Sequence, residues 1–218
     1  MTISRIIKVI LENRQAYLAG LAVTLKLCGV AWALGMIGGG SIALATEWRP
    51  RLIGLPMTAI GRIAEAVPIL VLLFWLHYPI QVMLGVVIDP FWTTAALLTI
   101  LNTLTVYGIL RRAIVNTPAE LVEVARVCGV IRRRIFWRIK LPLALRSALG
   151  SLTSSQVTVL QLSIFGSLIS VEELFRASQR IVAQTYKLVE VYTGLALFFI
   201  IVCLPLNLLA GRLERRLS

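Results

Sequence analysis

The stretch Glu123-Val-Ala-Arg-Val-Cys-Gly129, separated by nine residues from Ile139-Lys-Leu-Pro142, lies in a basic segment between two apolar segments. Gly129 can end a helix here, because glycine adopts the left-handed conformation at low cost. We expect the run from Arg132 to Arg138 to restart a helix, and we expect Leu141-Pro142 to break it. The pattern predicts a helix, a turn and a helix that form a docking element on a membrane protein.

The residues just before this stretch predict where its first helix begins. Thr117-Pro118-Ala119-Glu120 has the spacing of a capping box, with proline at the first helical position. In a capping box the threonine oxygen accepts a hydrogen bond from the backbone of the first turn, and the glutamate bonds back to the cap residue. We therefore expect residues 117–142 to form one loop that contains two short helices.

The composition independently indicates a membrane protein. Of the 218 residues, 58% are hydrophobic and only 15% are charged, and the mean hydropathy is +0.87, which is too apolar for an ordinary soluble domain. Apolar segments long enough to cross the bilayer core lie at 18–45, 53–76, 91–110, 149–169 and 189–210. No Pro-rich or Ser-rich linker divides the chain. The predicted fold class is an all-α membrane protein with about five transmembrane helices, and we expect residues 1–218 to form a single domain.

The distribution of Lys and Arg predicts the orientation, because cytoplasmic loops keep these residues and translocated loops carry fewer. Residues 78–90 contain neither. The loop after the third apolar segment contains Arg111, Arg112, Arg126, Arg132, Arg133, Arg134, Arg138 and Lys140. We therefore expect residues 117–142 to be cytoplasmic. With five spans, the carboxyl terminus is then also cytoplasmic and the amino terminus lies outside the cell.

Residues 1–17 have the pattern of an amphipathic helix, with apolar and charged residues on different faces. The apolar set is Ile3, Ile6, Ile7, Ile10 and Leu11, and the charged set is Arg5, Lys8, Glu12 and Arg14. We expect this segment to lie flat on the outer surface of the membrane. A cleaved signal peptide is the alternative, against which the short and interrupted apolar run counts.

The motif residues between positions 123 and 142 resemble a known family. Glu123, Ala125, Gly129, Ile139, Leu141 and Pro142 match the motif Glu-Ala-Ala, a few residues, Gly, nine residues, Ile-x-Leu-Pro of the permease subunits of ABC importers. Within the motif only Val124 departs, where the family has alanine. The flanks, from Gly20-Leu-Ala-Val-Thr-Leu to Arg212-Leu-Glu-Arg-Arg-Leu, resemble the polar amino-acid uptake branch, which includes histidine and glutamine permeases.

The resemblance implies a bundle similar to that of type I ABC importers in the bacterial inner membrane. It also implies two permeases that work with two ABC ATPase subunits and an extracytoplasmic solute-binding protein, with the motif residues coupling to the ATPase. ATP and magnesium would bind to the ATPase, because this chain has no Walker-type phosphate loop and no Ser-His-Asp or Cys-His grouping. We therefore expect a translocation subunit without catalytic residues, whose solute is an amino acid or a similar small molecule.

Charged residues inside an apolar segment are candidates for the solute path. A charge in a membrane span costs about 3 kcal/mol on insertion scales, so Arg62 and Glu65 need a partner or a water-filled cavity. Their three-residue spacing places them on one helical face, where a structural ion pair is the simpler interpretation. The alternative is that they line the path with Pro68, because the family has Glu-x-x-Arg-Gly-Thr-Pro at this place, with the two charges reversed.

Polar residues of the fourth apolar segment, which include Gln156, are further candidates. Gln161 and Ser163 fall in the place of the family's Lys-Asp-Thr-Ser stretch, and the acid of that stretch is missing. Another acid of the family is absent at Gly108. Interhelical hydrogen bonds are the equally weighted alternative for these polar groups. Because few acids remain to engage an ammonium group, we expect a second, different permease in a heterodimer rather than a homodimer.

Other functions agree less well with the sequence. The net charge of +12 could indicate nucleic acid, but the arginines follow the membrane topology without interleaved aromatic residues, so anionic membrane lipids are the expected partner. The three cysteines, Cys28, Cys128 and Cys203, have neither a metal-site nor a disulfide spacing. A self-contained secondary transporter or channel is the main alternative, motivated by the charges at positions 62 and 65. A membrane scaffold whose arginines bind lipid or nucleic acid is the third.

Overall fold

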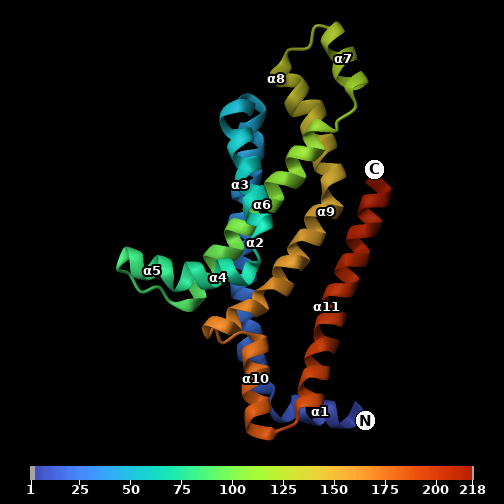
Figure 1. Cartoon of the computed structure of the whole chain (residues 1–218). Coiled ribbons are helices and arrows are strands. Elements are labelled where there is room, and N and C mark those ends of the chain that lie inside the picture. The colour runs from blue at the N-terminus through green and yellow to red at the C-terminus, as the bar shows by residue number, and fades with distance from the viewer. Residues whose placement is uncertain (1–2, 218) are drawn as a thin grey trace.

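The computed structural model describes residues 3–217 as helices joined by short turns (Figure 1). Every regular element within these residues is a helix, which confirms the predicted fold class. Within residues 3–217, four helical segments are long and apolar enough to cross a membrane, and counting a bent helix pair as one span gives a fifth. The four are α2 (Arg14–Trp48), α6 (Pro90–Val115), a continuous run Arg132–Ile169, and α11 (Leu188–Leu217).

The contact between α2 and α6 is the largest in the bundle, and glycines lie in it. Gly35, Gly38 and Gly39 of α2 face α6. A Cβ atom at Gly39 would lie 2.6 Å from the carbonyl oxygen of Thr103, which is closer than real contacts allow. Without side chains at these positions the two backbones approach closely, and close packing is what holds helices together in lipid.

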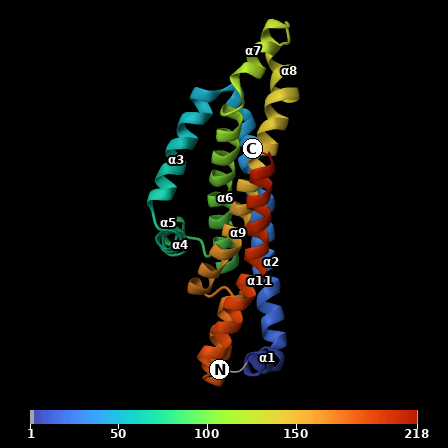
Figure 2. The same ribbon diagram turned by 90° about the vertical axis from the view of Figure 1, so that its right-hand side faces the viewer.

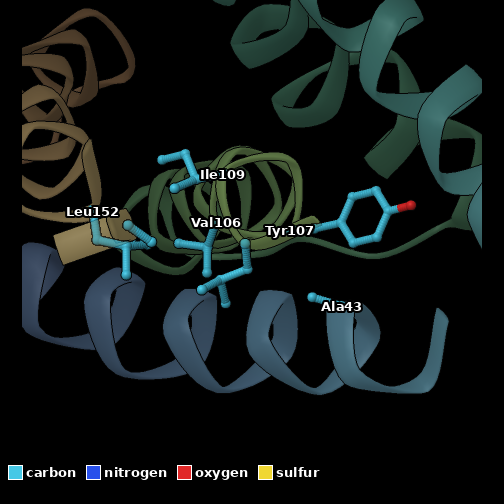
Figure 3. Close-up of a cluster of buried hydrophobic side chains, with 7 residues drawn as sticks. Ala43, Val106, Tyr107, Ile109 and Leu152 are labelled. Carbon is cyan, nitrogen blue, oxygen red and sulfur yellow. The ribbon is translucent and has the colours of Figure 1, made fainter. Parts of the chain in front are cut away.

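A buried apolar cluster joins α2, α6 and α9 (Leu141–Leu162), as Figure 3 shows. Ala43 of α2 faces Val106 and Tyr107 of α6, and Leu152 of α9 completes the contact. The Tyr107 hydroxyl donates a hydrogen bond to the carbonyl oxygen of Gly54 at 3.4 Å, in the π-helical turn η1 (Pro50–Gly54). The cluster therefore ties three spans and the turn after α2 together.

The second apolar segment is not the continuous span 53–76 that the sequence predicts. It forms α3 (Leu55–Ala66) and α4 (Ile69–His77), and α5 (Pro79–Leu84) follows. The α3 and α4–α5 parts are bent by 99°. Pro68 explains the bend, because it disfavours a helical conformation at Val67, whose φ of −99° and ψ of 127° are extended. As a result, α4 and α5 project sideways from the bundle (Figure 1).

α1 (Ile3–Glu12) is a helix, as predicted for this segment, and part of it packs against the bundle. Ile6 and Val9 are buried, and Val9 belongs to a cluster with side chains of α10 (Leu174–Thr185) and α11. Ile7 and Leu11 are exposed. One apolar face of α1 is thus covered by the protein, and the other is available to lipid.

No helix is predicted between residues 169 and 189, yet α10 forms there and packs against α2. Glu173 caps its first turn: the carboxylate accepts hydrogen bonds from the backbone N–H groups of Phe175 and Arg176, both at 2.8 Å. A Cβ atom at Gly20 of α2 would lie 2.9 Å from the Cβ atom of Ala177. The absence of a side chain at Gly20 therefore allows the close contact.

The loop of residues 117–142 begins differently from its prediction. α7 (Ala119–Val127) starts after Pro118, and no side chain caps it. The Thr117 hydroxyl instead donates to the carbonyl oxygens of Ala113 and Ile114, at 3.5 and 3.1 Å. The predicted capping box is therefore wrong, because the threonine bonds back to the preceding helix, as threonine hydroxyls often do.

Gly129 ends α7, as predicted. Its φ of +75° lies in the left-handed region, its N–H donates to the carbonyl oxygen of Arg126 at 2.9 Å, and the N–H of Val130 donates to that of Ala125 at 3.0 Å. These two bonds are those of a Schellman motif, in which glycine is the usual residue. The turn sends the chain from α7 back towards the bundle.

Pro142 does not break the second helix of the loop, which corrects that prediction. α8 (Arg132–Ile135), the π-helical turn η2 (Phe136–Lys140) and α9 follow one another without interruption, and η3 (Ser163–Ile169) completes the run. Pro142 lies in the first turn of α9. The N–H of Leu141 donates to the carbonyl oxygen of Phe136, five residues back. This wider turn accommodates the proline, which has no N–H and would crowd a regular helix.

Candidate functional site

The first half of the motif lies on α7, at the end of the bundle opposite to α1 and α10 (Figures 1 and 2). α7 packs against α8 and η2. Ala125 is buried in this contact, whereas the Glu123 side chain is exposed. The helix therefore presents Glu123 outward while Ala125 keeps it close to the chain that returns to the bundle.

α7 and the turn after it carry apolar side chains that the described part of the chain leaves uncovered. Leu121, Val124, Val127 and Ile131 are 48%, 63%, 89% and 64% exposed. Ile131 directly precedes the basic run Arg132–Arg134. An exposed apolar surface with a charged border is typical of a protein docking surface. This surface has that character.

The second half of the motif lies where η2 joins α9. Leu141 packs against a buried cluster between α6 and α9 that contains Phe136, which is 1% exposed. Ile139 is half-buried and Pro142 is exposed. Since α7 also contacts η2, the fold brings the two halves of the motif together at the base of the loop.

Glu47, in the last turn of α2, joins this loop to two spans. Its Oε2 atom accepts a hydrogen bond from Arg111 Nη1 of α6 at 3.3 Å, and its Oε1 atom accepts one from Lys140 Nζ of η2 at 3.1 Å. Only 11% of the Glu47 side chain is exposed. We name these three residues the Glu47 clamp.

Glu47 is not among the site residues predicted from the sequence. The sequence contained a signal for it, because Glu47 is an acid that lies two residues after the apolar segment 18–45. An acid at the end of a span needs a partner. The nearby loop contains many cations, but Glu47 and Lys140 are 93 positions apart, so the pairing itself is a property of the fold.

Arg62 and Glu65 do not form the ion pair that is the simpler interpretation of their spacing. Neither takes part in the ion pairs found among the described residues, and both side chains are exposed. They lie on α3, which has no buried residue, and Pro68 is exposed at the bend that follows. The structure thus places the two charges on a surface that this chain does not cover.

The candidates in the fourth span lie in different surroundings. Gln161 is exposed near the end of α9. Ser163 is fully buried, and its hydroxyl donates to the carbonyl oxygen of Leu160 at 2.8 Å. Its hydrogen bond is therefore made within its own helical run, and the structure does not bring it together with Arg62 or Glu65.

Interhelical hydrogen bonding, the alternative for the polar groups of the fourth span, is found at Gln156. Asn102 of α6 donates to the Gln156 side-chain oxygen at 3.0 Å and to the carbonyl oxygen of Ala31 at 2.9 Å. Trp32 Nε1 of α2 donates to the carbonyl oxygen of Gln156 at 3.0 Å. Gly35 makes room, because a Cβ atom there would lie 2.4 Å from Asn102 Nδ2. This network fastens α2, α6 and α9 to one another.

A cavity of about 490 Å³ opens where α6 and α9 meet the loop. Its polar lining residues are Arg112, Asn116, Thr117, Ser147 and Ser151. Ser151 belongs to the polar residues of segment 149–169, whereas Arg62, Glu65, Pro68, Gln161 and Ser163 do not line the cavity. The other polar groups at the loop end therefore converge on a space that sequence patterns did not indicate.

Comparison with known proteins shows the family. Residues 34–218 match the model of the binding-protein-dependent transport system inner membrane component. The glutamine transport system permease protein GlnP of Escherichia coli K12 is 30% identical over 199 residues, with 85% of this chain and 87% of the relative covered. The octopine transport system permease protein OccM of Rhizobium meliloti is 25% identical over 210 residues, with 93% of this chain and 84% of the relative covered. The L-cystine transport system permease protein TcyB of Bacillus subtilis is 26% identical over 200 residues, covering 91% and 85%.

Solved structures show the same fold. An amino acid ABC transporter crystallised with histidines has a TM-score of 0.86 and 25% identity, with 95% of this chain and 96% of that chain covered. The MetNI methionine ABC transporter in an inward-facing conformation has a TM-score of 0.75 at 20% identity, covering 94% and 97%. The chain therefore belongs to the family of binding-protein-dependent transport system inner membrane components, and it is a multi-pass permease subunit of the ABC amino-acid importer family.

Proposed function

We propose that this chain imports an amino acid or a similar small solute as the permease of an ATP-driven transporter that depends on an extracytoplasmic solute-binding protein. The observation that supports this most is α7, which projects from the bundle with Glu123 and apolar side chains exposed. ABC ATPase subunits would bind this surface. ATP and magnesium would bind to the ATPases, so that this chain moves the solute without catalysing hydrolysis.

The motif residues would couple the ATPases to the spans. Closure of the ATPases would move α7, and η2 would carry the movement because it contacts α7 and continues directly into α9. Phe136 packs in the cluster between α6 and α9, so the base of the loop and the spans would move as one unit. ATP would then shift the bundle between inward-facing and outward-facing states by binding one state more tightly.

Arg62 and Glu65 would line the solute path on α3, with Pro68 at the bend below them and with Gln161 and Ser163 as weaker candidates. Support comes from the exposure of both charges and from the absence of a partner for them among the ion pairs of residues 3–217. A free amino acid carries a carboxylate and an ammonium group, and charge-assisted hydrogen bonds to such groups are strong. The transport systems of the relatives are named for glutamine, octopine and cystine, which supports this solute class.

A second permease would cover α3, and we propose that it is a different chain. In a homodimer, two copies of Arg62 and Glu65 and of the neutral residues Gly108 and Leu162 would surround one path. Few acids would then be available to bind the ammonium group of the solute. Native mass spectrometry of the tagged complex tests this. Two identical copies without a second permease would overturn the heterodimer.

The amino terminus would lie outside the cell and the carboxyl terminus in the cytoplasm. Support comes from the fold, since α1 lies at one end of the bundle and α7 and α8 lie at the other (Figures 1 and 2). The basic residues of the loop favour the cytoplasmic side. Anionic lipid headgroups would contact these arginines.

Reconstitution of the purified complex in liposomes tests the function directly. In the double variant Glu123→Arg and Gly129→Pro, we expect loss of ATPase binding and of the ATP hydrolysis that the binding protein stimulates. The matched control is Glu120→Arg, an exposed acid on the same helix outside the motif. Normal stimulated hydrolysis in the double variant would contradict the proposal. Uptake by this chain alone, driven by an ion gradient without ATP, would instead support the secondary transporter.

A further inference from the structure

We propose that Glu47 is a positioning residue that makes ATP hydrolysis productive by fastening the coupling loop, residues 117–142, to α2 and α6 at once. The proposal rests on the coupling role proposed above for that loop. Glu47 itself lies outside the sequence motif and outside the loop, in the last turn of α2.

The geometry of the Glu47 clamp supports this role. The two carboxylate oxygens of Glu47 accept from different elements: Oε2 from Arg111 of α6 and Oε1 from Lys140 of η2, at 3.3 and 3.1 Å. The backbone oxygen of Glu47 accepts a third hydrogen bond, from Arg132 Nη2 of α8 at 3.3 Å. One residue of α2 is therefore bonded to α6, α8 and η2.

The charge balance makes Glu47 hard to replace. A cavity of about 210 Å³ beside it is lined by Glu47, Val122, Arg126, Arg132, Ile135, Phe136 and Lys140. Glu47 is the only acid in that lining, and three of the others are cations. Arg111 and Lys140 are only 27% and 22% exposed, so water screens their charges incompletely. Without the Glu47 carboxylate, Arg111 and Lys140 would repel each other, and the loop would move away from α2.

The Glu47 clamp also lies beside η2, where the helical run can bend. Lys140 is the last residue of η2, and π-helical turns of this kind often occur at functional sites. Phe136 anchors the other end of the turn through apolar packing, which is not directional. Apolar packing holds the loop close, whereas the charged hydrogen bonds set its angle. Movement of α7 would then reach α2 and α6 through Glu47 instead of being absorbed by the turn.

The test uses the full complex with its ATPases and binding protein in liposomes, and it measures solute moved per ATP hydrolysed. For Glu47→Gln, which keeps the size of the side chain, we expect this ratio to fall roughly three- to tenfold, because a partly buried charge pair is broken. The ATPase content and the melting temperature are measured on the same samples. The matched control is Glu172→Gln, an exposed glutamate paired with Arg180 beside α10, at the opposite end of the molecule.

A double-mutant cycle tests whether Glu47 acts through Lys140. We expect Lys140→Gln to lower the ratio as well, and we expect Glu47→Gln combined with Lys140→Gln to cost less than the sum of the two, because both remove one interaction. Should Glu47→Gln fail to fold, the Lys140→Gln variant carries the test alone, since Lys140 is more exposed. A normal ratio in that variant would overturn the proposal.

Two results separate failure of this inference from failure of the proposed coupling role. If Glu123→Arg abolishes ATPase binding while Glu47→Gln has the wild-type ratio, the coupling loop is correct and the clamp is wrong. If Glu123→Arg binds the ATPase and transports normally, the coupling role itself is wrong. A Glu47→Gln variant with a lowered melting temperature but an unchanged ratio shows a purely structural role and also overturns the inference.

Discussion

The coupling loop and the α3–α5 region differ in how this chain supports them. The loop exposes its tip on α7, but its base is held by the buried Phe136 and by Glu47. α3 has no buried residue, and its charges at positions 62 and 65 have no ion-pair partner in residues 3–217. The difference supports the proposals that the loop would transmit movement through this chain's own contacts and that α3 would take its contacts from another subunit or from solute.

Phe136→Ala should destabilise the protein most. Removing this fully buried ring leaves a cavity at the base of the loop and should cost about 3–5 kcal/mol of unfolding free energy. Thermal unfolding of the purified chain in detergent measures the loss. Trp137→Ala is the control, because the neighbouring ring is 47% exposed and should cost much less. Equal losses would show that the loop is not anchored through Phe136.

Glu173 gives a pH-dependent comparison, because this chain buries it completely while it leaves Glu65 exposed. Glu173 lies outside the candidate membrane spans. Burial raises the pKa of Glu173 to about 7, although the hydrogen bonds from two backbone N–H groups favour the ionised form and lower the pKa. A raised pKa means that folding favours the protonated acid. The contribution of Glu173 to the free energy of unfolding is therefore fully present below the ordinary carboxyl pKa, and it is lost as the pH rises through about 7.

The variant Glu173→Gln does not titrate, so we expect it to gain stability relative to the wild type as the pH rises from 4.5 to about 7. The gain should be on the order of 2 kcal/mol. Melting temperatures of both proteins across this range measure it. A difference between Glu173→Gln and wild type that is constant with pH would contradict the prediction.

Gly129→Ala and Gly85→Ala compare the two regions with matched substitutions. Both glycines have positive φ, +75° and +64°, and neither has an atom within 4 Å of an added Cβ. Each alanine should cost about 1–2 kcal/mol of local strain. Only Gly129→Ala should lower binding-protein-stimulated ATP hydrolysis, because Gly129 orients α7. The same loss from Gly85→Ala would mean that the α5 turn also takes part in coupling.

Arg62→Ala should have the smallest effect on the stability of the isolated chain. The side chain is exposed and has no ion-pair partner among the described residues, so the unfolding free energy should change by less than about 0.5 kcal/mol. Uptake by the full complex should nevertheless fall, if α3 lines the path. Uptake assays and thermal unfolding of the same variant measure the two effects. A large loss of stability with normal uptake would assign Arg62 a structural role instead.

The sequence determined the class of this protein, because bilayer thickness sets the length of an apolar span and five such segments can be read directly. It also determined the family, through the motif from Glu123 to Pro142. The end of α7 could be predicted as well, because the left-handed turn there depends on a single local residue, Gly129. These features depend on local conformation or on residue spacing. No distant contact is required to recognise them.

Which polar residues meet depends on how the helices pack against one another. Glu47 joins Lys140 across 93 positions, and Asn102 joins Gln156 across 54, so no local pattern indicates either pair. Arg62 and Glu65, which spacing suggested as partners, are exposed and unpaired in the described chain. The physical reason is that hydropathy places a residue in a span, whereas the packing of the spans, set here by glycines such as Gly35 and Gly39, decides which side chain it faces.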